Sequence, residues 1–227
     1  MIADNMAQVR VRIARACEAA ERPVQSVTLL AVSKTVAAPA VQEAFDAGQR
    51  AFGENQVQEG VAKIAALGGL RERIEWHLIG PLQSNKTRVV AEQFDWVHSV
   101  DRLRVAQRLS EQRPGHLPAL QICLQVNISG EASKSGLAPS ELAEVAMAVA
   151  ELPRLRLRGL MAVPQATSNY AEQRRSHCAL RELLLALRAR GLHLDTLSMG
   201  MTGDLEAAIA EGATLVRVGT AIFGRRG

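Results

Sequence analysis

The sequence alternates short apolar runs with segments of helical periodicity along almost its whole length. Eight apolar runs have the composition of buried strands: Thr28–Ser33, Ala51–Gly53, Ile74–Ile79, Trp96–Val100, Leu120–Ile128, Leu155–Val163, Thr196–Met199 and Thr214–Phe223. Seven segments with helical spacing separate them: Ala38–Ala47, Gln56–Leu67, Asn85–Gln93, Arg102–Gln112, Pro139–Leu152, Tyr170–Arg190 and Leu205–Glu211. This alternation predicts parallel strands joined by helical crossovers.

The strand count and the length of 227 residues favour one closed α/β architecture, a (β/α)₈ TIM-type barrel. An open doubly wound sheet is the rival, but eight strands are many for one and no GxGxxG motif follows the first strand. An extra N-terminal helix is predicted because five apolar residues share one helical face: Met6, Val9, Ile13, Ala16 and Ala20. This helix would fill the gap between strands eight and one, since the eighth strand leaves no room for a final helix. We expect residues 1–227 to form a single domain.

Composition excludes several classes of protein. No run approaches the roughly 18 apolar residues of a membrane helix, and the N-terminal segment lacks the pattern of a targeting signal, so we expect a cytoplasmic protein without membrane contact. Three widely spaced cysteines, Cys17, Cys123 and Cys178, are read as free thiols and offer no metal site. A net charge of +4 and 3% aromatic residues make nucleic acid an improbable partner.

Lysine is rare in this chain. Only four of the 27 basic residues are lysines, namely Lys34, Lys63, Lys86 and Lys134. Lys34 ends the first predicted strand, where a lysine either extends to solvent or pairs with a carboxylate. The functional alternative is a desolvated amine that forms a Schiff base with a carbonyl, which arginine cannot do.

Other polar residues follow or end the predicted strands, and in a barrel these strand ends meet at one mouth. The residues supplied there are Lys34, Glu54, Asn55, His77, Asn127, Ser198, Gly200, Arg217, Gly219 and Thr220. Hydroxyls and glycines after strands seven and eight are typical of a phosphate cradle. The alternative is that Gly200, Gly203 and Gly219 only permit tight turns.

Arg217 and His77 lie inside apolar strands, and each has two interpretations. A buried arginine is costly unless it is paired. Arg217 would therefore form a salt bridge to a carboxylate such as Glu54, or a hydrogen bond to an acceptor on a ligand. His77 would be a satisfied core histidine or a proton-transfer group.

A carbonyl-trapping lysine opposite a phosphate cradle and an arginine points to pyridoxal 5′-phosphate. Six motifs carry a specific resemblance: Ala31-Val32-Ser33-Lys34-Thr35, Phe52-Gly53-Glu54-Asn55, Trp76-His77-Leu78-Ile79-Gly80-Pro81-Leu82-Gln83-Ser84-Asn85-Lys86, Arg158-Gly159-Leu160-Met161, Leu197-Ser198-Met199-Gly200-Met201 and Val216-Arg217-Val218-Gly219-Thr220-Ala221-Ile222-Phe223-Gly224. In this order, over nearly the whole chain, they resemble the pyridoxal phosphate homeostasis proteins (the YggS/PROSC family).

The resemblance implies a single barrel like the N-terminal domain of bacterial alanine racemase, with pyridoxal phosphate bound covalently to Lys34. It also implies a set of contacts: the phosphate on Ser198, Gly200, Gly219 and Thr220, the pyridine nitrogen on Arg217, and the ring near Asn55 and His77. Thr202-Gly203 departs from the family pattern, in which serine followed by an acidic or other polar residue is common.

We expect a carrier of the cofactor in vitamin B6 homeostasis, with no catalytic residue. An arginine at the pyridine nitrogen keeps it unprotonated and weakens the ring as an electron sink. Racemisation also needs a second base opposite the lysine; the racemase takes a tyrosine from another domain, whereas Tyr170, the only tyrosine here, starts the helix after strand six. The alternative is an amino-acid racemase with weak or residual activity.

The expected partners are pyridoxal phosphate and enzymes that depend on it, in their cofactor-free form. We expect a monomer. The segment 129–136, which contains Lys134, is interpreted as a lid over the end of strand five.

Overall fold

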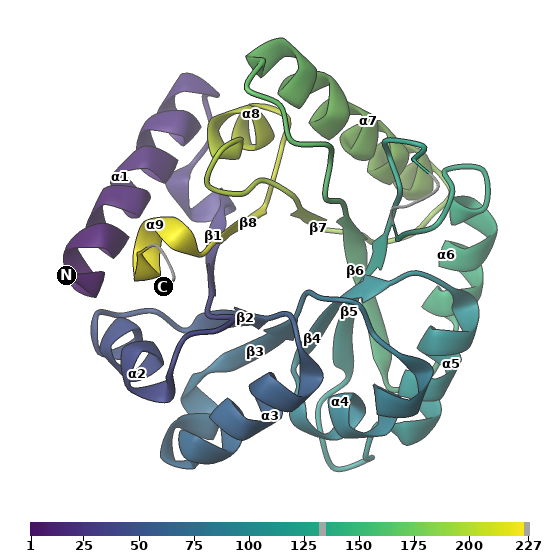
Figure 1. The fold of residues 1–227 in the computed structure, drawn as a ribbon. Coiled ribbons are helices and arrows are strands. Elements are labelled where there is room, and N and C mark those ends of the chain that lie inside the picture. Colours follow the sequence, from purple (N-terminus) through teal and green to yellow (C-terminus); the bar gives the residue numbers. More distant parts are fainter. Residues whose placement is uncertain (132–134, 225–227) are drawn as a thin grey trace.

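A computed structural model describes residues 1–131 and 135–224. Within these ranges eight parallel strands pair in chain order, and β8 pairs back with β1, so that the sheet closes into a barrel (Figure 1). The strands are β1 (Thr28–Val32), β2 (Ala51–Glu54), β3 (Glu75–Leu78), β4 (Trp96–Val100), β5 (Leu120–Gln125), β6 (Leu155–Met161), β7 (Thr196–Ser198) and β8 (Leu215–Val218). The predicted (β/α)₈ barrel is confirmed.

Helices follow the first seven strands and surround the barrel (Figure 1). They are α2 (Ala38–Asp46), α3 (Val57–Ala66), α4 (Thr87–Gln93), α5 (Leu103–Gln112), α6 (Leu142–Ala150), α7 (Tyr170–Ala189) and α8 (Leu205–Ala210), with short 3₁₀ turns at Val24–Ser26, Gly68–Arg73 and Ser84–Lys86. Pro39 sits in the first turn of α2, where its missing N–H costs nothing. Over the described residues, no helix is both long and apolar enough to cross a bilayer.

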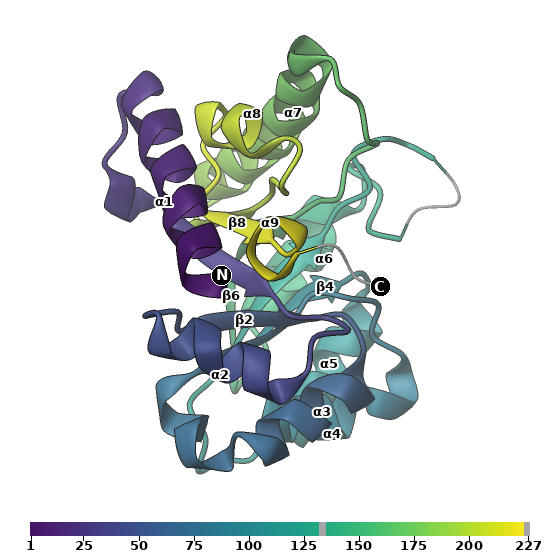
Figure 2. The ribbon, with the colours of Figure 1, turned by 60° about the vertical axis from the view of Figure 1, so that its left-hand side comes forward.

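The predicted N-terminal helix is present as α1 (Ile2–Ala19), which packs against α2, α8 and a short last helix, α9 (Thr220–Phe223). Its buried face carries Met6, Val9 and Ile13. Figure 2 shows α9 beside the start of α1, and the Asn5 side-chain amide donates to the carbonyl of Ile222 at 2.8 Å. The two ends of the described chain therefore pack together over the seam between β8 and β1.

The eighth strand is shorter than predicted. The run Thr214–Phe223 divides into β8, which ends at Val218, and the helix α9, so the expectation that no helix follows the eighth strand is wrong. A short apolar run fits a buried strand and a buried helix equally well. Gly219 ends the strand, and the turn of helix after it buries Ile222 completely.

Side chains alternate between the two faces of the barrel wall. Ala31, Val216 and Val218 belong to the large core between wall and helices, whereas their neighbours point inward, as the two-residue period of a strand requires. The interior holds two small apolar clusters, one of Leu30, Ala51 and Leu215 and one of Trp96, Cys123 and Met161. A connected set of buried polar side chains also lies there: His77, His98, Ser198 and Arg217.

Gly159 allows β6 and β7 to approach each other. A Cβ atom there would overlap the backbone carbonyl of Thr196, and backbone on a paired strand has no room to move aside. We expect Gly159→Ala to lower the free energy of unfolding by about 2 kcal/mol or more in urea denaturation followed by circular dichroism. Gly115→Ala is the matched control, because no atom lies within 4 Å of its added methyl group; its effect should stay within about 0.5 kcal/mol. Equal losses in both variants would contradict this account.

Candidate functional site

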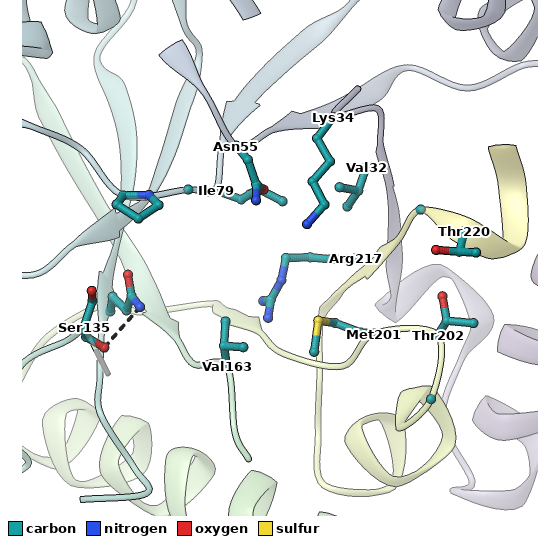
Figure 3. Close-up of a pocket in the computed structure, with 15 residues that line it drawn as sticks. Val32, Lys34, Asn55, Ile79, Ser135, Val163, Met201, Thr202, Arg217 and Thr220 are labelled. Atoms are coloured by element: carbon teal, nitrogen blue, oxygen red, sulfur yellow. Dashed lines mark hydrogen bonds between the residues drawn. The ribbon is translucent and has the colours of Figure 1, made fainter. Parts of the chain in front are cut away.

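A cavity of about 570 Å³ opens at the mouth of the barrel where the strands end (Figure 3). Its walls come from segments that follow β1, β2, β3, β6, β7 and β8, together with Gln125 at the end of β5. The polar side chains that line it are Lys34, Asn55, Gln125, Ser135, Thr202, Arg217 and Thr220. The cavity thus gathers residues from both ends and the middle of the chain.

Lys34 follows β1, and its amine points into the cavity (Figure 3). In the part of the chain that the structure describes, this amine makes no hydrogen bond or ion pair. The residues on either side are tied down: the Ser33 carbonyl accepts from the Lys63 amine, and the Thr35 N–H donates to the Glu59 carboxylate. Thr35 also has a positive φ of 61°. The backbone around Lys34 is therefore fixed while its amine is left for a ligand.

Lys63 and Glu54 form a buried ion pair behind this loop. The Lys63 amine lies 2.8 Å from Glu54 Oε1 and 2.7 Å from Glu59 Oε1, and only 7% of the Lys63 side chain is exposed. Burial raises the pKa of Glu54, although hydrogen bonds from Lys63 and Ser33 oppose this rise. The interpretation of Glu54 as a salt-bridge partner of Arg217 is wrong. Glu54 Oε1 accepts from Lys63 and Ser33, whereas the bonded N–H groups of Arg217 face Ser198 and Ala162.

Arg217 forms the floor of the cavity and is buried. Its Nη1 donates to the Ser198 carbonyl at 2.6 Å and to Ser198 Oγ at 2.7 Å, and its Nη2 donates to the Ala162 carbonyl at 2.8 Å. These contacts account for three of its five N–H groups. Burial lowers the pKa of Arg217 to about 10, so that it stays protonated at neutral pH.

The loop between β7 and α8 faces the start of α9 across one side of the cavity. Thr202 and Gly203 from this loop line the wall together with Gly219 and Thr220 (Figure 3). Among the described residues, none accepts a hydrogen bond from the backbone N–H of these four. Four free N–H groups and two hydroxyls suit an anion such as a phosphate.

Three side chains hold this loop in place. Asp204 accepts from the Met201 N–H at 2.6 Å, Gln173 donates to the Gly203 carbonyl, and Arg12 donates to the Thr202 carbonyl. Burial alone would raise the pKa of Asp204, but hydrogen bonds from His177 and Met201 outweigh it and leave that pKa below its ordinary value. Asp204 is therefore an anionic anchor beneath the loop.

The structure separates the predicted site residues into two groups. Five line the cavity: Lys34, Asn55, Arg217, Gly219 and Thr220. Ser198 and His77 lie below it, with their side chains buried in the barrel interior. Gly200 also lies behind the wall, where it has a φ of +93° and an added Cβ would come within 2.5 Å of the Ala208 methyl group. These surroundings fit the alternative interpretation, in which Gly200 permits a tight turn.

Sequence reasoning missed several residues of the wall. Thr202 was noted only as part of a departure from a family pattern, although a hydroxyl just after a strand was the signal that could have found it. Gly203 was weighed as a cradle or turn glycine but was not among the predicted site residues. Gly80 also lines the cavity, and a side chain there would overlap the backbone of Asn55. Ser135, from the predicted lid 129–136, borders the cavity. Residues 132–134 of that segment, which include Lys134, lie outside the described residues.

Comparison with known proteins places this geometry in a family. The model of the alanine racemase N-terminal domain family matches residues 5–227. The pyridoxal phosphate homeostasis protein of Pseudomonas aeruginosa is 61% identical over 99% of this chain and 96% of its own length. That of Escherichia coli K12 is 57% identical over 99% of this chain and 97% of its own length.

Solved structures agree with this relationship. PipY of Synechococcus elongatus, solved without pyridoxal phosphate, is 40% identical over 99% of this chain and all of its own, with a TM-score of 0.88; the structure described with pyridoxal phosphate bound gives 0.86. Alanine racemase from Corynebacterium glutamicum shares the fold, at 18% identity and a TM-score of 0.67, over 99% of this chain and 61% of its own. The chain therefore belongs to the pyridoxal phosphate homeostasis proteins, within the alanine racemase N-terminal domain family.

Proposed function

We propose that this protein carries pyridoxal 5′-phosphate in vitamin B6 homeostasis, with residues 1–227 as one binding domain and the cofactor attached to Lys34 as a Schiff base. The observation that carries the proposal is a free lysine amine opposite a set of free N–H groups, across one cavity with Arg217 as its floor. The names of the relatives and the pyridoxal phosphate bound to PipY support it. When bound, pyridoxal phosphate supplies an aldehyde that bonds to amines and a ring that withdraws electrons.

The residues present fit each part of this cofactor. Thr202, Gly203, Gly219 and Thr220 offer hydroxyls and N–H groups to the phosphate. Lys34 offers its amine to the aldehyde carbon. The N–H groups of Arg217 that Ser198 and Ala162 leave free would donate to the pyridine nitrogen. Asn55 lines the cavity near Lys34 and would lie beside the ring (Figure 3).

The lining favours a carrier over an enzyme. Among the described residues that line the cavity, Lys34 and Arg217 are the titratable ones, and an arginine is a poor proton donor or acceptor. Racemisation needs one acid–base group on each face of the substrate. Tyr170 lies in a different groove, with Arg12 and Arg15. Cofactor-free enzymes that accept pyridoxal phosphate are the partners that this role requires.

The first test concerns Lys34. In the parent protein mixed with pyridoxal phosphate, we expect a visible imine absorption that disappears on borohydride reduction. Lys34→Ala should show no such absorption, because the bonding amine is gone. Lys86→Ala is the matched control: Lys86 ends a 3₁₀ turn and is not part of the cavity lining. An unchanged, reducible absorption in Lys34→Ala would move the attachment to Lys86 or Lys134.

A second test concerns the phosphate. Thr202→Val and Thr220→Val each remove a hydroxyl at nearly constant volume. A hydrogen bond to a charged group is worth about 1.5–3 kcal/mol, so each variant should bind pyridoxal phosphate roughly ten- to a hundredfold more weakly in equilibrium titrations. Pyridoxal, which has no phosphate, should bind all three proteins alike. Equal weakening of both ligands would show that these threonines shape the cavity instead.

The third test separates carrier from racemase. Protein loaded with pyridoxal phosphate and incubated with L-alanine should change the optical activity no faster than the same concentration of free cofactor. The reason is that, among the described residues of the lining, Lys34 and Arg217 are the titratable ones, and arginine is a poor acid–base group. A polarimeter and chiral chromatography provide independent readings. Clear turnover that Lys34→Ala abolishes would establish the racemase alternative.

A further inference from the structure

A chain of buried polar groups crosses the barrel interior beneath the cavity. Ser198 Oγ, which accepts from Arg217, lies 2.8 Å from His98 Nδ1. The opposite ring nitrogen of His98, Nε2, lies 2.9 Å from His77 Nδ1. His77 Nε2 is 3.7 Å from a carboxylate oxygen of Glu75, at the start of β3 and therefore at the end of the barrel opposite the cavity. At most 1% of His77, His98 or Ser198 is exposed.

The two ends of this chain determine where its hydrogens lie. Arg217 can only donate, so Ser198 Oγ accepts from it and has its own hydrogen left for His98 Nδ1. When the Ser198 hydrogen is directed at Nδ1, His98 carries its own hydrogen on Nε2 and donates it to His77 Nδ1. His77 in turn carries its hydrogen on Nε2, which makes no hydrogen bond within the described part of the chain but faces the negative Glu75 carboxylate at 3.7 Å.

The reverse arrangement is unfavourable at both ends. It would leave the Ser198 hydrogen without an acceptor beside the positive Arg217, and it would turn a lone pair of His77 toward the Glu75 carboxylate. An arginine at one end and a carboxylate at the other thus select the same direction for every hydrogen bond.

His98 stays neutral within this chain. Burial, reinforced by the nearby His77 and Arg217, holds the pKa of His98 well below its ordinary value. The approach of the His77 ring lowers the pKa of Glu75, which keeps that end anionic. Arg217 therefore carries a positive charge at one end and Glu75 a negative charge at the other, and in this arrangement each acceptor atom along the chain faces the Arg217 side.

We propose that His98 is a positioning residue for Arg217. In the tautomer that His77 and Glu75 select, His98 accepts the Ser198 hydrogen. The Ser198 oxygen is thereby kept for Nη1 of Arg217, and the remaining N–H groups of Arg217 point into the cavity. Without that acceptor, the Ser198 side chain would turn about its Cα–Cβ bond to find another partner for its hydrogen, and Arg217 would lose one of its three anchors. This inference rests on the proposed function, in which Arg217 donates to the pyridine nitrogen of bound pyridoxal phosphate.

The experiment compares two ligands, pyridoxal 5′-phosphate and its 1-deaza analogue, in which a C–H group replaces the pyridine nitrogen. His98→Phe removes the acceptor, and His98→Asn places an amide oxygen near the position of Nδ1. We expect His98→Phe to bind pyridoxal phosphate roughly tenfold more weakly, as the loss of one hydrogen bond implies, with no change for the deaza analogue. His98→Asn should recover most of the lost affinity.

A control and a second variant keep the test decisive. Cys123→Ala alters another buried residue of the interior that lies outside the chain of hydrogen bonds, and it should bind both ligands like the parent protein. Circular dichroism reports folding. If His98→Phe does not fold, Ser198→Ala breaks the same link by removing one oxygen, and it should show the same selective loss.

Four results would overturn the inference or its basis. Equal weakening of both ligands by His98→Phe would mean that His98 only supports the barrel, and no weakening of either would mean that Arg217 needs no such support. If the parent protein binds both ligands equally, Arg217 does not contact the pyridine nitrogen. If it binds neither, the proposed function itself fails.

Discussion

Pairing of β8 with β1 is the interaction on which the site depends. The register Leu30 to Arg217 and Ala31 to Val218 closes the barrel and brings the residues after each strand, Lys34 and Thr220, to one cavity. The seam is secured from outside, where Arg22 of the segment after α1 donates to the carbonyls of Ile209 and Ala213. The proposed covalent attachment and the proposed phosphate binding would thus fall to distant parts of the chain that barrel closure joins.

Closure also forces a positive charge into the interior, because Arg217 is an inward-facing residue of β8. A carboxylate partner would neutralise it, but would also occupy the guanidinium and add an anion to the cavity floor. The protein instead keeps the buried charges near the cavity in two separate groups. Lys63 neutralises Glu54 behind the Lys34 loop, while Arg217 is held by carbonyl and hydroxyl oxygens. This separation leaves both Lys34 and Arg217 with groups free to bind.

The alternation of apolar runs was enough to predict the barrel, and the rarity of lysine was enough to single out Lys34. Finer features could not be read in this way. Ser198 and Thr202 are both hydroxyl residues near the end of β7, and only the structure shows that one faces the barrel interior and the other the cavity. Strand periodicity points His77 inward, but its contact with His98 depends on how β3 pairs with β4. The helix α9 was hidden because its apolar residues also suit a strand.

The donor-only character of Arg217 connects its geometry to a carrier's task. A protonated pyridine nitrogen would point its hydrogen at another donor, so this floor favours a ring whose nitrogen is an acceptor. Such a ring withdraws electrons poorly from carbon atoms attached through the aldehyde. An amine that enters the cavity would then exchange with Lys34 more readily than it would lose a proton from its α-carbon. Under the proposed function, this floor would therefore hold the cofactor while restraining its chemistry.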